Sequence, residues 1–185
     1  LGYCLQSQEI YEDDKVAKSS NSDQFTKSES KKENKMEEFF KIEETIEKTI
    51  PVGSSSMINI SNFEGKVVIN SGSTNEVKVK AKKMAMDEKS AKGIKVNILQ
   101  ESDKILLEAD FVNPDRKVNL DGNTFYSKGA YVEWDIIMPP NLNLSVETGD
   151  GMITIKGING KMAVKTKDGN LKISECAGDL NAETY

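Results

Sequence analysis

The chain has 185 residues, of which 30% are charged and 37% hydrophobic, and its net charge is −5 at pH 7. This length suits one domain with a tail, and the acidic balance argues against a nucleic-acid partner, which would require a basic patch. Histidine is absent from the sequence, so the commonest general base and the commonest zinc ligand are both missing.

Residues 1–35 are dominated by Ser, Lys, Glu and Asp, and after Tyr11 only Val16 and Phe25 are clearly apolar. Such a segment buries too little surface to offset the entropy lost on ordering. We therefore expect a disordered spacer, and its mixed-sign charges should keep it solvated.

Residues 36–50 form a lead-in segment that fits two kinds of structure. Its apolar positions are Phe39, Ile42, Ile46 and Ile50. They fit one face of a helix, but a spacing of four also satisfies the period of two of a strand. Pro51 and the glycine–serine run after it predict a turn that ends the segment.

Between residues 58 and 138, apolar and polar residues alternate in six segments, which predicts half-buried β-strands. The apolar positions are Ile58 and Ile60; Val67 and Ile69; Val77, Val79 and Ala81; Ile94, Val96 and Ile98; Ile105, Leu107 and Ala109; and Val132, Trp134, Ile136 and Met138. Residues 83–93 interrupt the pattern, and Asp87 is placed to cap a short helical turn ending at Gly93. Residues 112–130 predict a long exposed loop.

After Pro140 the sequence becomes self-similar with a period of 18 residues. The spacing is shared by Thr148, Thr166 and Thr184, by Gly151 and Gly169, by Gly160 and Gly178, and by Met162 and Leu180. Each repeat holds two short strands that end in glycine-bearing turns, as in stacked-coil folds. Stacking would place equivalent residues about 4.8 Å apart, so the threonines would form a ladder.

Alternation also assigns the inward residues of this region. They are Leu144, Val146, Thr148, Ile153, Ile155, Met162, Val164, Thr166, Leu171 and Ile173. The pairs Asp150-Gly151 and Asp168-Gly169 suit turns that need positive φ. We predict an all-β chain whose residues 51–185 form a β-solenoid or β-helix-like repeat domain, irregular at its start and truncated within a repeat. An antiparallel β-sandwich or meander with Asp–Gly hairpins is the alternative.

Four strings in this region resemble a known family. They are Ile50-Pro51-Val52, residues 58–67 (INISNFEGKV), residues 134–139 (WDIIMP) and Thr148-Gly149-Asp150-Gly151. They are similar to the bacterial putative-adhesin domains of unknown function, a β-solenoid family with an Asn-x-x-Gly-x-Val opening, a strand ending in proline and Thr-x-x-Gly repeats. The resemblance spans roughly residues 45–185. It implies a secreted or surface-anchored repeat domain and transfers no catalytic residues.

Cys4 is a candidate lipid-attachment site, because Leu1-Gly2-Tyr3-Cys4 is similar to a bacterial lipobox. Tyr3 departs from the small residue that the signal peptidase prefers, whereas the long polar spacer suits a surface lipoprotein. Three readings stay open: a lipidated Cys4, an unmodified cysteine in a tail, and a Cys4–Cys176 disulfide.

The remaining candidate sites have structural explanations. Asp150 and Asp168 recur one period apart and could align for calcium, but turn chemistry accounts for them. Glycoside hydrolysis needs two carboxyl groups held across a cleft. The sequence gives no sign of such a cleft around the candidate pairs, Asp13 with Asp14 and Asp110 with Asp115.

Two further residues are expected in the core. Trp134 lies on the inward side of its strand, so core packing is expected rather than a sugar-stacking platform. Cys176 is expected to be a small apolar filler.

We therefore predict a non-catalytic, bacterial, extracytoplasmic domain at the cell surface or in the cell envelope, with a structural or adhesive role. It would use no cofactor or metal, bind an unknown surface ligand or another envelope protein, and touch the membrane only through a lipid on Cys4. The first alternative is an envelope scaffold that assembles by strand-edge addition at its coil ends. The second is a carbohydrate-active enzyme on a β-helix.

Overall fold

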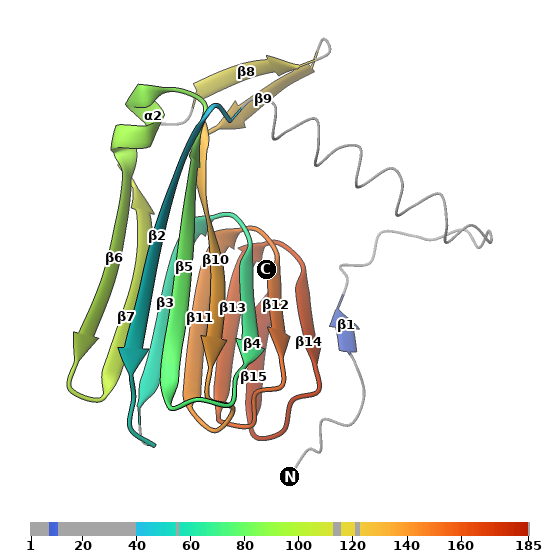
Figure 1. The fold of residues 1–185 in the computed structure, drawn as a ribbon. Coiled ribbons are helices and arrows are strands. Elements are labelled where there is room, and N and C mark those ends of the chain that lie inside the picture. The colour runs from blue at the N-terminus through green and yellow to red at the C-terminus, as the bar shows by residue number, and fades with distance from the viewer. Residues whose placement is uncertain (1–7, 11–39, 55, 113–115, 121–122, 185) are drawn as a thin grey trace, which may run out of the picture.

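The structure is a computed structural model, and it describes residues 8–10, 40–54, 56–112, 116–120 and 123–184. These residues form two mixed β-sheets that enclose one apolar core, together with a short helix and a separate two-stranded sheet (Figure 1). The all-β class predicted from the sequence is confirmed.

Sheet A has seven strands in the order β1-β14-β12-β4-β10-β5-β2. Its strands are β1 (Gln8–Ile10), β2 (Ile42–Pro51), β4 (Val67–Ser71), β5 (Glu76–Ala85), β10 (Ala130–Met138), β12 (Ile153–Lys156) and β14 (Leu171–Ser174). Strands β14, β12, β4 and β10 run parallel to one another, whereas β1, β5 and β2 each pair antiparallel with a neighbour.

Sheet B has six strands in the order β15-β13-β11-β3-β7-β6. Its strands are β3 (Met57–Glu64), β6 (Ile94–Glu101), β7 (Lys104–Phe111), β11 (Asn143–Asp150), β13 (Met162–Asp168) and β15 (Leu180–Thr184). All neighbours in this sheet are parallel except β6 and β7. The helix α2 (Glu88–Gly93) and the two-stranded sheet of β8 (Arg116–Leu120) and β9 (Asn123–Ser127) lie at one end of the sandwich (Figure 1).

The core lies between the two sheets and is built by the alternation seen in the sequence. Every predicted inward position from Ile58 to Ile173 lies in a strand, and all are buried except Val96 and Ile98, which are half-buried on the edge strand β6. Each buried Val, Leu or Ile side chain contributes roughly 1.5–3 kcal/mol, so this pattern largely determines which face of each strand turns inward.

The 18-residue period of the sequence equals the offset between neighbouring parallel strands. In sheet B, Leu144 pairs with Met162, and Met162 pairs with Leu180. In sheet A, Ile153 pairs with Leu171. The predicted threonine ladder is confirmed, because Thr166 pairs with both of its period-mates, Thr148 and Thr184.

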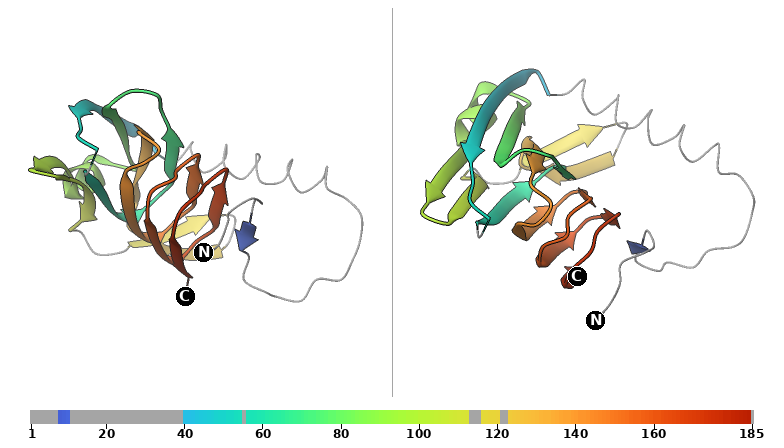
Figure 2. Two further views of the ribbon diagram at one scale, coloured as in Figure 1. Left: turned by 90° about the horizontal axis from the view of Figure 1, so that it is seen from below. Right: turned by 60° about the horizontal axis from the view of Figure 1, so that its bottom comes forward.

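Strands on either side of each Asp–Gly turn lie in opposite sheets, so these turns do not form antiparallel hairpins (Figure 2). The two Asp–Gly turns differ in backbone conformation. Gly151 has φ +141°, whereas the φ of Gly169 is not positive. The positive φ expected at Gly169 is therefore wrong. Its glycine is needed for space, because a Cβ there would lie 1.9 Å from the carbonyl oxygen of Gly151.

A third unit joins this arrangement from far upstream. Strand β3 pairs in parallel with β11, so that Ile58 stands beside Leu144 and Asn62 beside Thr148. Strand β4 pairs in the same way with β12. The sequence showed the period only after Pro140, whereas the parallel stacking begins with residues 57–71.

Asp87 caps α2 as predicted, since its Oδ1 accepts a hydrogen bond from the backbone N–H of Ser90 at 2.8 Å. From Ile42, the ambiguous lead-in is the strand β2. The long loop predicted for residues 112–130 is wrong for residues 116–120 and 123–127, because these form β8 and β9, which pair with each other.

The predicted spacer, residues 1–35, lies outside the described residues except for β1. Residues Gln8–Ile10 pair with β14, and the disorder expected of the spacer stays a prediction. The unpaired backbone groups of that edge strand give this segment hydrogen-bond partners that the composition does not reveal. No helix in the described ranges is long and apolar enough to cross a bilayer.

Candidate functional site

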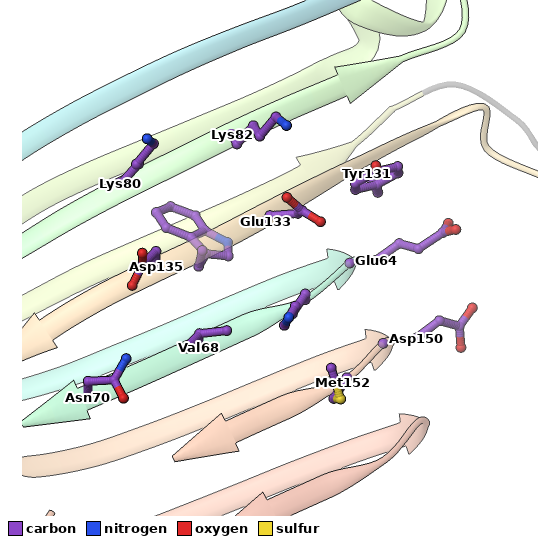
Figure 3. A pocket seen from close by; sticks show the side chains of 14 residues that line it. Glu64, Val68, Asn70, Lys80, Lys82, Tyr131, Glu133, Asp135, Asp150 and Met152 are labelled. Carbon is purple, nitrogen blue, oxygen red and sulfur yellow. The ribbon is translucent and has the colours of Figure 1, made fainter. Parts of the chain in front are cut away.

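A shallow hollow of about 780 Å³ lies on the outer face of sheet A, over β4, β5 and β10 (Figure 3). We call it the trough. Strand β5 contributes Lys80 and Lys82, and β10 contributes Tyr131, Glu133 and Asp135. The turns that follow β3 and β11 border one end of it.

The polar lining follows from the alternation that fills the core. Val79 and Ala81 of β5 point inward, so Lys80 and Lys82 point outward. On β10, the inward direction of Trp134 likewise turns Glu133 to the outer face.

The charges of the trough are mixed and alternate across the strands. Lys80 stands beside Asp135, and Lys82 stands beside Glu133. Both ammonium groups form ion pairs on their other side, toward β2: Lys80 Nζ lies 3.7 Å from Glu47 Oε1, and Lys82 Nζ lies 3.3 Å from Glu43 Oε2.

Glu133 and Asp135 are two carboxylates of the trough that can accept hydrogen bonds from a ligand. Neither forms an ion pair with another residue of the described ranges. Two positions apart on one strand face, their Cα atoms are about 6.6 Å from each other. A ligand in the trough would therefore meet carboxylates, the hydrocarbon stems of lysines, and the side chains of Val68 and Met152.

Trp134 is not a platform for a ligand, and its predicted role in the core is confirmed. The residue is 1% exposed and lies on the inward side of β10. Its Nε1 donates a hydrogen bond to Asn62 Oδ1 at 3.3 Å.

Asn62 is the buried polar residue that the sequence reasoning missed. Its Nδ2 donates to the carbonyl oxygens of Val132 at 3.1 Å and Glu64 at 3.2 Å. The amide thereby ties the turn at one end of the trough to β10. The sequence holds a signal for the position of Asn62, because Asn62-x-x-Gly65 has the same spacing as Thr148-x-x-Gly151 of the repeat.

The turns beside the trough form a column that continues the strand ladder. The N–H of Gly65 donates to Asp150 O at 2.9 Å, and the N–H of Gly151 donates to Asp168 O at 3.0 Å. A Cβ on Gly151 would lie 2.1 Å from Gly65 O, so only glycine permits this approach.

The aspartates proposed for calcium stand at the ends of strands. Asp150 pairs in register with Asp168 on one side and with Glu64 on the other. Within the described ranges, no three His, Cys, Asp or Glu side chains are arranged to hold a metal ion. The expectation that the chain uses no metal stays a prediction.

The remaining candidates are not brought together. Asp110 Oδ1 accepts a hydrogen bond from the N–H of Phe111 at 2.7 Å, while Asp13, Asp14 and Asp115 lie outside the described residues. Cys4 also lies outside them.

Cys176 is buried, and its Sγ contacts the carbonyl oxygen of Ser174 at 3.1 Å. Its side chain takes the place in the last turn that Ile158 takes one period earlier, and both are buried. The predicted filler role is in agreement with this position.

No family model matches the chain, and no curated protein matches it in sequence. Among solved structures, the chain is similar to a putative cell adhesion protein from Clostridium sporogenes. The match has a TM-score of 0.49 and 14% sequence identity, and it covers 77% of this chain and 68% of the other. This distant likeness assigns neither a family nor a ligand.

Proposed function

We propose that the chain is a non-catalytic, extracytoplasmic β-domain with a structural or adhesive role, and that its parallel units are coils of a short β-solenoid. Here a coil is one strand of sheet B, its glycine turn and the following strand of sheet A: β3–β4, β11–β12 and β13–β14. The domain would bind through its outer faces rather than through an enclosed pocket.

The observation that carries this proposal is the strand register. Because equivalent residues of successive coils stand side by side, outward side chains form rows across the sheet. One such row in sheet B is Glu147, Lys165 and Glu183, in which Lys165 Nζ lies 3.4 Å from Glu183 Oε2. Rows of this kind suit extended ligands that make many weak contacts.

The trough is the part of this surface that we assign to ligand binding. Its open shape and mixed lining suit a polar polymer lying across the strands, with Glu133 and Asp135 accepting hydrogen bonds. The coil β3–β4 would keep the trough rigid, because β4 forms its floor and is held between β10 and β12.

The proposed location rests on the amino-terminal sequence. A lipid on Cys4 would tether the domain to a bacterial membrane, and residues 5–41 would separate the two. Metabolic labelling with a clickable fatty acid tests this: the wild-type chain, expressed with its own upstream sequence, should be labelled and Cys4→Ser should not. Equal labelling of both would contradict lipidation of Cys4.

The adhesive role can be tested with beads coated with the chain. We expect retention on polysaccharide- or protein-coated surfaces above that of albumin-coated beads. A trough variant, Glu133→Lys with Asp135→Lys, should lower retention by roughly tenfold or more, since it replaces both acceptors and places like charges beside Lys80 and Lys82.

A matched control has the same spacing on the other sheet. Glu108 and Asp110 lie two residues apart on the outer face of β7 and are exposed, so Glu108→Lys with Asp110→Lys should leave retention unchanged. No retention of the wild type, or equal loss in both double variants, would contradict the proposed binding surface.

A further inference from the structure

The trough carries more carboxylates than ammonium groups. Its lining holds four carboxylates, on Glu64, Glu133, Asp135 and Asp150, against three lysines. Two of these lysines, Lys80 and Lys82, form ion pairs with Glu47 and Glu43 of β2, which bring two more carboxylates to the same face. The charge balance at the trough is therefore negative, and a negative surface attracts cationic ligands.

One acidic side chain precedes the turn glycine of each coil, at the end of the trough. Glu64, Asp150 and Asp168 stand side by side in register on neighbouring strands, where like charges repel one another. Aspartate suits such a turn because its short side chain can bond to the nearby backbone. Glutamate lacks this role, so turn chemistry does not account for the charge at Glu64. A cation lying along the row would offset the repulsion.

The floor of the trough offers no sheet edge to a peptide. Strands β4, β10 and β5 are each paired with a strand on both sides, so an extended peptide could not add to them by strand pairing, a common mode of peptide recognition. Binding there depends on side chains, which are the carboxylates, the apolar groups of Val68 and Met152, and the ring of Tyr131. These suit a chain that carries many hydroxyl and ammonium donors between apolar C–H faces.

We propose that the trough takes a polysaccharide whose amino sugars carry free amines. The inference rests on the proposed binding of a polar polymer in the trough and names the class of that polymer. Tyr131, Glu133 and Asp135 follow one another along β10 at the trough (Figure 3). An ammonium group of the ligand would there meet two carboxylates for charge-assisted hydrogen bonds and an aromatic ring for a cation–π contact.

Glu43 and Glu47 are the positioning residues of this site. Neither lines the trough, and they act through the lysines with which they pair. By neutralising Lys82 and Lys80 they reduce the repulsion that these lysines exert on a cationic ligand over β10. The carboxylates of β2 would thus set the preference for amines over acids without touching the ligand.

A matched pair of ligands tests the ligand class. The glucosamine hexamer and the N-acetylglucosamine hexamer share one backbone and differ at the nitrogen, which is charged only in the first. In calorimetric titrations of the 1–185 chain at slightly acid pH and low salt, the amine form should bind at least about tenfold more tightly. Added salt should weaken this binding. Equal binding of the two hexamers would overturn the amine preference.

The same titrations separate this inference from the proposed function. Binding of neither hexamer, with bead retention that still depends on Glu133 and Asp135, would overturn the ligand class and leave the binding role of the trough standing. A lysine hexapeptide separates the polysaccharide from a basic polypeptide. It should bind more weakly than the glucosamine hexamer, and binding of equal strength would overturn the assignment to a polysaccharide.

Uncharged substitutions in the trough test the place of binding. Glu133→Gln with Asp135→Asn removes both charges at nearly constant size and should lower the affinity for the glucosamine hexamer by about tenfold or more. Glu108→Gln with Asp110→Asn, on the outer face of β7, is the matched control and should leave the affinity unchanged. Equal losses in the two double variants would overturn the assigned site.

Glu43→Gln with Glu47→Gln tests the positioning role. Because exposed ion pairs contribute little to stability, the circular dichroism spectrum and the melting temperature should stay unchanged. The released lysines should lower the affinity for the glucosamine hexamer about threefold and raise that for the galacturonic acid hexamer, its acidic counterpart. Adding Lys80→Gln and Lys82→Gln should restore the preference for the amine. An unchanged preference in the Glu43/Glu47 double variant would overturn the positioning role.

Discussion

The Trp134 indole donates a hydrogen bond to Asn62 Oδ1 at 3.3 Å, although the two residues are 72 positions apart. This contact joins β10 of sheet A to β3 of sheet B across the core. The same amide donates to Val132 O at 3.1 Å, so one buried side chain links both sheets and the turn beside the trough.

Asn62→Ala should therefore be costly. It leaves the Trp134 N–H and the Val132 carbonyl without these partners, and each buried unsatisfied group costs about 1–3 kcal/mol. We expect the free energy of unfolding to fall by about 2–4 kcal/mol in urea titrations. Asn59→Ala, on the outer face of the same strand, should stay within about 0.5 kcal/mol; equal losses would contradict the role of the Asn62 amide.

Gly151→Ala should destabilise the domain through the backbone. Its φ is +141°, and a Cβ would lie 2.1 Å from the carbonyl oxygen of Gly65. We expect a loss of at least about 2 kcal/mol, measured as a lower melting temperature. Gly53 has open space around its Cβ position and no positive φ, so Gly53→Ala should be nearly neutral, and a comparable loss there would argue against this explanation.

Thr166→Val should stabilise the protein. Thr166 Oγ1 is buried and has no hydrogen-bond partner within the described structure, so its hydroxyl carries a desolvation cost that valine removes. We expect a gain of about 1 kcal/mol in the free energy of unfolding.

Thr148 provides the matched comparison for that substitution. Its Oγ1 makes a 3.5 Å contact with Asp150 O. Thr148→Val should be neutral or slightly destabilising. The account of the ladder would be wrong if Thr166→Val were the more damaging of the two.

The side of the sandwich away from β15 is closed by side chains. Lys48 Nζ of β2 donates to Ile98 O of β6 at 2.9 Å, and Gln100 Nε2 donates to Pro51 O at 3.2 Å. Lys48→Met keeps the hydrocarbon stem and removes the donor, so global stability should fall by less than about 1 kcal/mol. Hydrogen exchange at the β6 amides should become faster. Unchanged exchange would contradict the claim that the Lys48 side chain holds the edge strands β2 and β6 together.

Alternation predicted the strands and the core because the side-chain period of a strand is short and local. The 18-residue period likewise predicted the offset that places Thr148 beside Thr166. Both signals lie within a few dozen residues, where sequence comparison along one chain can find them.

Features that depend on distant pairing were not predictable in this way. Asn62 stands beside Thr148 only because β3 joins a stack whose other members lie far downstream. The trough combines β4, β5 and β10, and no local pattern places Glu133 near Lys82. Strand β1 depends on the free edge of β14, which composition alone cannot indicate.

The central claim is that residues one 18-residue period apart stand side by side on neighbouring strands. Nitroxide labels at Ala163→Cys and Asn181→Cys test it most directly, with Cys4 and Cys176 replaced by alanine and the protein kept dilute. Ala163 pairs with Asn181 in sheet B, whereas Ser174 lies in sheet A. We expect dipolar broadening for the 163/181 pair and none for a 163/174 pair. Broadening of the 163/174 pair alone, as an antiparallel hairpin around Asp168-Gly169 would produce, would contradict the claim.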